Sequence, residues 1–348
     1  MFLKGGRCSF EQIFLQYKDE NRRFTGGKSR LEDAVVHEKM PKMCPPNLET
    51  HPSQGGTYTI KRFVSRILSL GLALTAATAA AEADMPAETT KALSVGSVTV
   101  YDFGDIKLHA YSMGDALSDE CYLLESDEGL VMLETGAFTD QLNAWKGYID
   151  GLDKPLAGAL LAYHPNGIEV FGDILVYATE KALSNWGKGG SIRGLTDGFV
   201  ATFGDGVAAN LPTKANLIKT GDTVTLAGMD FVIREEGDDA YGVEIPQINC
   251  VYIHMLGSKC HNILTSREHM LAFAEELRGF QYTLVLTSHY VPEGADAVQA
   301  KLVYLDRALE LSNACATAEE FKSAMQSAFP DYTGENYLDM TAGMLYKE

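Results

Sequence analysis

The sequence is short of positive charge. Its 348 residues include 29 lysines and arginines but 47 aspartates and glutamates, and twelve of the basic and eight of the acidic residues precede Asp84. The stretch from Asp84 to Glu348 therefore carries 17 basic and 39 acidic residues, a formal net charge of −22. Nucleic acids and anionic membrane surfaces carry the same sign, so this deficit argues against both as partners.

Cysteines are also few, and none forms a C-x-x-C pair. A zinc site built on paired thiolates is therefore not expected. Four cysteines follow Asp84, namely Cys121, Cys250, Cys260 and Cys315. An even number in an exported chain is compatible with one or two disulfides, whose pairing the spacing does not fix.

The longest apolar run near the start of the chain is too short to span a bilayer. It extends from Ile67 to Ala77, follows three basic residues and precedes the small-residue cleavage pattern Ala81-Glu82-Ala83. Residues 60–83 are therefore predicted to be a secretory signal peptide. The mature protein is expected in the periplasm or outside the cell, without a membrane span.

Residues 1–59 precede this signal and are polar and without pattern. Because signal peptides normally start at the first residue, this segment is interpreted as an upstream extension from a misassigned start codon. The alternative is a disordered tail before an internal membrane anchor. Residues 84–348 remain as one predicted domain, long enough to bury a substantial core.

The stretch from Leu156 to Gly172 organises this domain. Its first half is apolar with small residues interleaved, which is typical of a strand buried on both faces. Pro165 and the following Asn-Gly pair then force a turn. His164 stands on that turn, at the carboxyl end of a strand, where open α/β sheets place their ligands. A later buried strand also terminates on a histidine, His289.

Strand patterns occur in both halves of the domain. The first half has hairpins before Glu134 and an amphipathic helix at Phe138 to Leu152, and the second half has strands at Asn249 to Met255 and His261 to Leu264. The glycine-rich segment Gly187 to Asn210 is predicted to be a surface insertion that serves as a lid or binding loop. Two β-rich halves with helices outside them predict an α/β (α+β) fold, with two sheets packed face to face.

Several of these segments resemble the metallo-β-lactamase fold superfamily. They are the strand that ends at Glu134-Thr135-Gly136, the strand that runs into His164, the Gly-Asp-Thr-Val-Thr-Leu hairpin and the strand that ends at Ser288-His289. The resemblance covers nearly all of Asp102 to Asn313 in the same order. It implies an αββα sandwich of two mixed sheets, whose hydrolytic members hold one or two zinc or iron ions where the sheets meet.

The first ligand motif that this resemblance implies is incomplete. His164 takes the place of the first histidine of H-x-H-x-D-H, but Asn166, Ile168 and Glu169 occupy the three other ligand positions. A neutral amide is a weak metal ligand and isoleucine is none.

The later ligand positions are incomplete as well. The loop expected to supply a histidine offers Asp238 and Asp239, and the bridging aspartate falls near Thr265-Ser266. His289 matches the final histidine. Two imidazoles are fewer than the three protein ligands that a catalytic zinc site uses, so the resemblance predicts an eroded dinuclear site.

Three functions remain open at this point. In the first, the exported domain binds a small molecule in the crevice, with weak or no metal-dependent hydrolysis. In the second, one zinc or iron ion supports hydrolysis of an ester, lactone or thioester, on a set drawn from His164, Glu169, Asp238, Asp239 and His289. In the third, an enzyme without metal uses His164 or His289 as base, with Cys121 as the candidate nucleophile, although a structural role is favoured for Cys121.

Aromatic residues on the expected site-side loops favour an apolar or aromatic small ligand. The residues predicted to contact it are Tyr163, Asn166, Trp186, Tyr241 and Tyr290. His254, His261 and His269 are interpreted as structural side chains, whose hydrogen bonds are made inside the fold, and are not assigned to the site. Glu134 replaces the aspartate of the family's Asp-Thr-Gly and is expected to support the turn.

Overall fold

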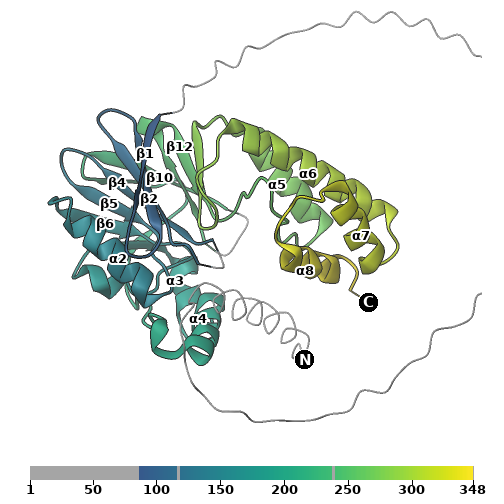
Figure 1. Cartoon of the computed structure of the whole chain (residues 1–348), viewed down its shortest axis with the longest axis horizontal. Coiled ribbons are helices and arrows are strands. Elements are labelled where there is room, and N and C mark those ends of the chain that lie inside the picture. The colour runs from purple at the N-terminus through teal and green to yellow at the C-terminus, as the bar shows by residue number, and fades with distance from the viewer. Residues whose placement is uncertain (1–85, 116–117, 237–239, 348) are drawn as a thin grey trace, which may run out of the picture. The chain divides into compact units, whose positions relative to one another are not determined.

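The computed structural model describes residues 86–115, 118–236 and 240–347 (Figure 1). The predicted extension (1–59) and signal peptide (60–83), and the candidate ligands Asp238 and Asp239, lie outside the described residues. All described residues belong to one compact unit. Within these ranges, every helix is too short or too polar to cross a bilayer.

The first sheet has eight strands in the order β1 to β8. Strands β1 to β5 pair antiparallel, whereas β5 to β8 pair parallel. The strands are β1 (Ala87–Ala92), β2 (Ser97–Asp102), β3 (Lys107–Ser112), β4 (Glu120–Glu125), β5 (Leu130–Leu133), β6 (Leu156–Leu160), β7 (Val176–Thr179) and β8 (Asn216–Ile218).

The second sheet has five strands in the order β13-β12-β11-β10-β9, and only β12 and β13 pair parallel. The strands are β9 (Thr223–Leu226), β10 (Met229–Arg234), β11 (Gly242–Ile245), β12 (Cys250–Ile253) and β13 (Leu284–Thr287). Both sheets are therefore mixed, and the predicted α/β sandwich of two mixed sheets is confirmed.

Alternating side chains assign the two faces of the second sheet. Along β12, Cys250 and Tyr252 join the main core, which also contains residues of the first sheet, whereas Val251 and Ile253 pack into a second core with the C-terminal helices. Successive side chains of a strand point to opposite faces, so a strand that is apolar at every position must be covered on both. The four residues of β12 meet this condition, since all are buried.

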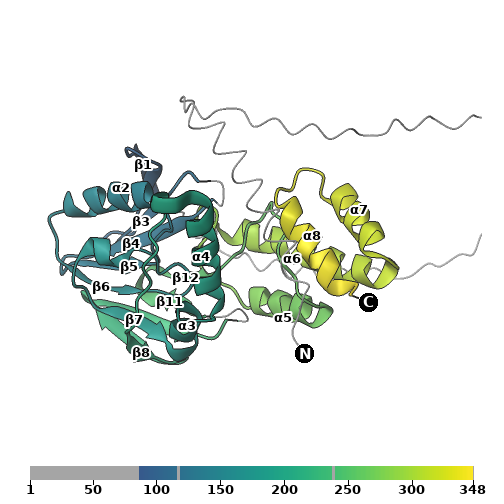
Figure 2. The same cartoon turned by 90° about the horizontal axis from the view of Figure 1, so that it is seen from below.

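Seven α-helices and three short 3₁₀ turns lie among the described residues. The helices are α2 (Thr139–Asp150), α3 (Glu180–Trp186), α4 (Ser191–Phe203), α5 (Arg267–Arg278), α6 (Ala295–Ala314), α7 (Ala318–Ala328) and α8 (Glu335–Leu345), and the turns are η1 (Ile168–Phe171), η2 (Gly204–Gly206) and η3 (Pro246–Ile248). Figures 1 and 2 show α5 to α8 grouped together, apart from α2, α3 and α4. Helix α2 buries Leu142, Trp145 and Ile149, the apolar stripe expected from the sequence.

Three expectations from the sequence are wrong. The segment Gly187 to Asn210 is largely helical rather than a loop, because α4 packs Phe199 against Phe138 and Val207 in a small core, and its role as a lid stays a prediction. His261 to Leu264 forms no strand and follows an irregular path. The four cysteines after Asp84 are free thiols rather than disulfides.

Candidate metal centre

The turn that carries His164 is held by a buried carboxylate. Glu134 directly follows β5, is 1% exposed and has a φ of 63°. Its Oε1 accepts the N–H of Ala162 at 2.9 Å, and its Oε2 accepts the N–H of His164 at 2.7 Å. The N–H of Tyr163 and the hydroxyl of Tyr252 also donate to this carboxylate. These bonds replace the sheet ladder where β6 ends, so the predicted supporting role of Glu134 is confirmed.

The other two site histidines follow two adjacent parallel strands. Ile253, the last residue of β12, pairs with Thr287, the last residue of β13. His254 follows Ile253 directly, and His289 follows Thr287 after one residue. The N–H of Ser288 donates to the carbonyl of His254 at 2.9 Å, which keeps the two strand ends together. Parallel strands end at the same edge of a sheet, so both imidazoles arrive at one place.

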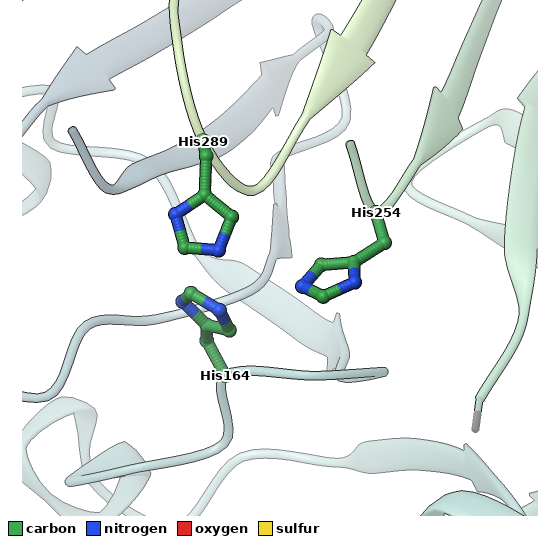
Figure 3. A group of neighbouring side chains, drawn as sticks. All are labelled: His164, His254 and His289. Carbon is green, nitrogen blue, oxygen red and sulfur yellow. The ribbon is translucent and has the colours of Figure 1, made fainter. Parts of the chain in front are cut away.

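The three imidazoles converge (Figure 3). One ring nitrogen from each of His164, His254 and His289 lies within 4.8 Å of the other two. Ring centroids are 5.1 Å apart for His164 and His289, 5.4 Å for His254 and His289, and 6.2 Å for His164 and His254. The rings are steeply inclined to one another, at 53° to 76°, so their edges rather than their faces meet.

Asp119 is a buried carboxylate in contact with this group. It is 1% exposed, its Oδ1 lies 2.9 Å from Nδ1 of His289, and its Oδ2 lies 4.0 Å from Nδ1 of His164. Nδ1 of His289 donates its hydrogen to Asp119, so Nε2 is the nitrogen of that ring that carries the lone pair. Figure 3 shows one nitrogen of His289 facing the other two rings and the second turned away.

The electrostatics of this group favour neutral imidazole beside a charged carboxylate. Burial lowers the pKa of His164 to about 3, although Asp119 opposes this shift. For Asp119, burial acts to raise the pKa, but His164 and His289 together outweigh it and hold the pKa below its usual value. Burial raises the pKa of the neighbouring Glu120 to about 8. A neutral imidazole keeps the nitrogen lone pair that a metal requires.

Two of the predicted polar site residues lie elsewhere. Glu169 is exposed and its carboxylate accepts a hydrogen bond from Asn210 at 2.8 Å. The side chain of Asn166 is buried and donates to Thr196 and to the carbonyl of Ala208. Both side chains secure the turn after β6, which corrects their assignment to metal and ligand binding.

The predicted aromatic lining is only partly at the site. Trp186 and Tyr241 are each 1% exposed, and the Tyr241 hydroxyl donates to the carbonyl of Leu161, so both are core residues and the prediction for them is wrong. Tyr163 stacks on His254, with ring centroids 3.9 Å apart. Tyr290 follows His289, is partly exposed and has a φ of 71°.

Cys121 is not placed as a nucleophile. It lies within β4 with no exposed surface, and burial raises the pKa of its thiol well above the usual value. A thiol needs access and a low pKa to attack a substrate, so the burial of Cys121 agrees with the structural role that the sequence favours for it.

Sequence reasoning missed His254 and Asp119. The sequence favoured a structural role for His254, with its hydrogen bonds made inside the fold. It also placed the metal-bridging aspartate at Thr265-Ser266, two residues that precede α5. A usable signal was present, because His254, like His164 and His289, lies just after the end of a strand with buried residues. Asp119 had no such signal, since its approach to His289 depends on a bridge between residues 170 positions apart.

Solved structures of similar fold share little sequence with this chain. The sec-alkyl sulfatase PisA1 from Pseudomonas sp., as a double mutant, is 15% identical with a TM-score of 0.52, over 71% of this chain and 50% of that chain. A β-lactamase domain protein from Burkholderia ambifaria is 16% identical with a TM-score of 0.47, over 71% of this chain and 88% of that protein. A metallo-β-lactamase family protein from Thermus thermophilus is 14% identical with a TM-score of 0.48, over 68% of this chain and 90% of that protein.

The match therefore spans half the length of the alkylsulfatase. No protein-family model and no curated protein matches the sequence. At these identities the similarity concerns the fold alone, and the chain has the metallo-β-lactamase fold that its sequence predicted.

The residues present fit a single metal ion. The three histidines form a candidate site for one metal ion. Nitrogens on one tetrahedral zinc, with bonds of about 2.1 Å, lie about 3.4 Å apart. An ion would therefore draw the most distant pair together by about 1.4 Å at most. Two imidazoles were expected from the sequence, and the structure supplies a third.

Proposed function

We propose that this domain is a hydrolase that holds one zinc or iron ion between His164, His254 and His289 and cleaves an ester, lactone or thioester. The observation that carries this proposal is the convergence of three imidazole nitrogens within 4.8 Å at the ends of three strands. It corresponds to the second function left open by the sequence, with His254 in place of the expected acidic ligands.

Three histidine ligands suit a catalytic rather than a structural site. A structural zinc has four protein ligands, whereas a catalytic zinc has three and an open position. When bound there, zinc or iron lowers the pKa of a water molecule toward neutrality and polarises the bond to be cleaved.

Asp119 has a defined task in this proposal. By holding the proton on Nδ1 of His289 at 2.9 Å, it favours the tautomer in which Nε2 carries the lone pair that binds the ion. Its second oxygen lies 4.0 Å from Nδ1 of His164, so the same carboxylate also faces that ring. Tyr163 covers one face of His254 and so limits the rotation of that ring and its contact with water.

The proposal keeps one part of the prediction made from the sequence, the loss of the second ion. The positions of the motif that follow His164 carry Asn166, whose amide is engaged by Thr196, and Ile168, which is buried. Neither supports a second ion. One ion rather than two therefore distinguishes this chain from the dinuclear arrangement that the resemblance implied.

Metal content tests the proposal. The full chain, purified without an affinity tag, is expected to hold about one equivalent of zinc or iron by elemental analysis. His164→Ala, His254→Ala and His289→Ala are each expected to lose it. His269→Ala is the matched control, because His269 lies on α5 with Thr265 as its partner, and it should keep the ion.

A substrate panel then tests hydrolysis. It contains esters, lactones, thioesters and, because of the alkylsulfatase of similar fold, a secondary alkyl sulfate. Turnover that follows metal content across the four variants supports the proposal. A wild-type chain that takes up no ion, even when titrated with zinc and iron, refutes it and favours metal-independent binding of a small molecule.

Export is a separate proposal that rests on the sequence pattern at residues 60–83. N-terminal sequencing of the protein recovered from the periplasm or medium tests it. A chain that starts at Asp84 supports cleavage after Ala83. A chain that retains residues 1–59 and sediments with membranes favours the internal anchor instead.

A further inference from the structure

We infer that Tyr252 positions all three histidines of the candidate metal centre. Its hydroxyl bonds to Glu134 and to Ser288, and its own strand, β12, leads into His254. The inference deepens the proposed function and rests on it for the presence of an ion. The hydrogen bonds that carry it need no ion.

The first link runs from Tyr252 to the turn of His164. The Tyr252 hydroxyl donates to Oε1 of Glu134 at 2.8 Å. The other oxygen of that carboxylate accepts the backbone N–H of His164 at 2.7 Å. Glu134 follows a strand of the eight-stranded sheet, whereas Tyr252 lies in the five-stranded sheet. The hydroxyl therefore ties the turn of His164 to the sheet that carries the other two histidines.

The second link runs from Tyr252 to the loop of His289. The hydroxyl oxygen of Tyr252 lies 2.5 Å from Oγ of Ser288, the residue before His289. Because the phenol proton is donated to Glu134, the serine hydroxyl is the donor of this second bond. Donation thus runs from Ser288 to Tyr252 to Glu134. The chain ends on a carboxylate, which polarises each bond along it.

Ser288 connects this chain to the backbone of His289. Its N–H donates to the carbonyl of His254 at 2.9 Å, and its carbonyl accepts the N–H of Glu120 at 2.8 Å. With its hydroxyl bonded to Tyr252, each polar atom of Ser288 has a partner within the fold. A residue bound in three directions fixes where the following residue, His289, begins.

The hydroxyl of Tyr252 is itself held in place by packing. Glu134 and Tyr252 are each 1% exposed and Ser288 is fully buried, so bulk water does not compete for these bonds. The ring of Tyr252 meets that of Tyr122 edge to face, with centroids 6.3 Å apart and planes at 67°. The Tyr122 hydroxyl accepts the N–H of Thr287 at 2.9 Å and donates to its carbonyl at 2.6 Å. The end of β13 is therefore fixed from the same side.

The position of this hydroxyl explains why one side chain can act on three ligands. Two of the segments that carry a site histidine are bonded to it, and the third is its own strand. Tyr252 acts through Glu134 and Ser288, so it is a positioning residue rather than a ligand. Residues that orient metal ligands in this way change metal affinity by about 10- to 100-fold when they are replaced.

Cobalt binding to the full chain tests the inference. Co²⁺ is titrated into the metal-free protein, and its visible absorption, which is strong in four-coordinate and weak in six-coordinate sites, reports affinity and geometry together. Tyr252→Phe removes one oxygen atom. It should weaken cobalt binding by about 10- to 100-fold and reduce the visible absorption of the bound ion.

Tyr111→Phe is the matched control. Tyr111 is also fully buried, and its hydroxyl bonds to the carbonyls of Val95 and Gln141, in segments that carry no site histidine. Both variants lose one buried hydroxyl, so similar shifts of the urea midpoint are expected. Only Tyr252→Phe should change cobalt binding and its spectrum, which separates positioning from a general loss of stability.

A double variant tests the link through Ser288. Ser288→Ala should weaken cobalt binding by about tenfold, and combined with Tyr252→Phe it should add nothing to the loss seen in Tyr252→Phe alone. Two losses that multiply would show independent roles and overturn the inference. Ser288→Ala also gives a reading of its own if Tyr252→Phe does not fold, because wild-type cobalt affinity in this variant would exclude the link.

The imidazoles of the metal-free protein give a reading that needs no ion. With histidine labelled at Cε1, NMR of the wild type should give one sharp signal for each site histidine, assigned with the three single alanine variants described above. In Tyr252→Phe these three signals should broaden or split. The signal of His261, whose Nδ1 contacts Tyr304, should stay unchanged.

The outcomes separate the two proposals. Wild-type cobalt binding or unchanged imidazole signals in Tyr252→Phe overturn the inference, as do equal losses of cobalt affinity in Tyr252→Phe and Tyr111→Phe. A wild-type chain that takes up no ion refutes the proposed function, but the imidazole signals still decide the role of Tyr252. The two failures are therefore distinguishable.

Discussion

Replacing Glu134 by glutamine should both destabilise the domain and weaken its metal site. The carboxylate receives N–H groups from three successive residues, Ala162 to His164, and the hydroxyl of Tyr252. Glutamine keeps one acceptor oxygen but turns an NH₂ group toward the remaining donors. At least one buried backbone N–H then faces another donor.

The magnitude follows from these bonds. A hydrogen bond to a charged group contributes about 1.5–3 kcal/mol, and a buried donor left without an acceptor costs a further 1–3 kcal/mol or so. With one bond lost and one N–H opposed, Glu134→Gln is expected to lower the free energy of unfolding by about 3–5 kcal/mol. Domains of this kind are stable by about 5–15 kcal/mol, so the variant should still fold.

Urea denaturation of wild type and variant, followed by circular dichroism, measures the change. Glu244→Gln is the control, since Glu244 also has two partners, Arg234 and Tyr282, but is about one-third exposed, and a loss below about 1 kcal/mol is expected. The variant should also bind zinc at least about tenfold more weakly, because the turn under His164 loosens. A loss in Glu134→Gln no greater than in the control would refute the reasoning.

Three further predictions concern charge, metal and thiols. Lys301 is fully buried and donates to the carbonyl of Cys260, and burial lowers its pKa to about 7. Between pH 7 and the usual lysine pKa of 10.5, this amine is therefore protonated in the unfolded chain but largely neutral in the folded one. Stability should therefore rise with pH in that window, and from pH 7 to 9 wild type should gain about 2 kcal/mol over Lys301→Met in urea denaturation. Parallel pH profiles would contradict this. Zinc added to the metal-free protein at 100 times its dissociation constant should stabilise it by about 2.7 kcal/mol, and His254→Ala should abolish this gain. A thiol reagent should label only Cys315 rapidly among the four cysteines after Asp84, because Cys121, Cys250 and Cys260 are at most 1% exposed; fast labelling of all four would show the core to be open.

The fold was predictable because its strands carry clear patterns. β5, β12 and β13 are buried at every position, and each reads in the sequence as a short apolar run that ends at a turn. Helix α4 was not predicted, although Leu195, Phe199 and Phe203 recur at helical spacing. Its two internal glycines, Gly194 and Gly198, lower the helix propensity of the segment, and the helix is stabilised instead by packing against Phe138.

The site was less predictable because its members meet through tertiary structure. His164 and His289 were found because a family resemblance named their positions. His254 and His261 look alike in the sequence, but His254 reaches the site, whereas His261 is fully buried and its Nδ1 contacts Tyr304 at 3.2 Å. The difference comes from the pairing of β12 with β13, for which no local pattern exists.

The contacts of the aromatic side chains, and not their positions in loops, decided which of them reach the site. Tyr163 and Tyr241 both occupy loops, yet Tyr163 stacks on His254. The hydroxyl of Tyr241 instead donates to the carbonyls of Leu161, which follows β6, and Tyr177, which lies in β7 of the other sheet. A tyrosine in a loop can thus close the interior of a sandwich instead of facing a ligand.

The origin of the three imidazoles has a mechanical consequence. His164 follows a strand of the eight-stranded sheet, whereas His254 and His289 follow strands of the five-stranded sheet. An ion bonded to all three would fasten the two layers of the sandwich at one edge, as a staple does. Uptake and release of metal would then change how freely the layers move against each other, so the amide hydrogens near the ends of β6, β12 and β13 should exchange more slowly when the ion is bound.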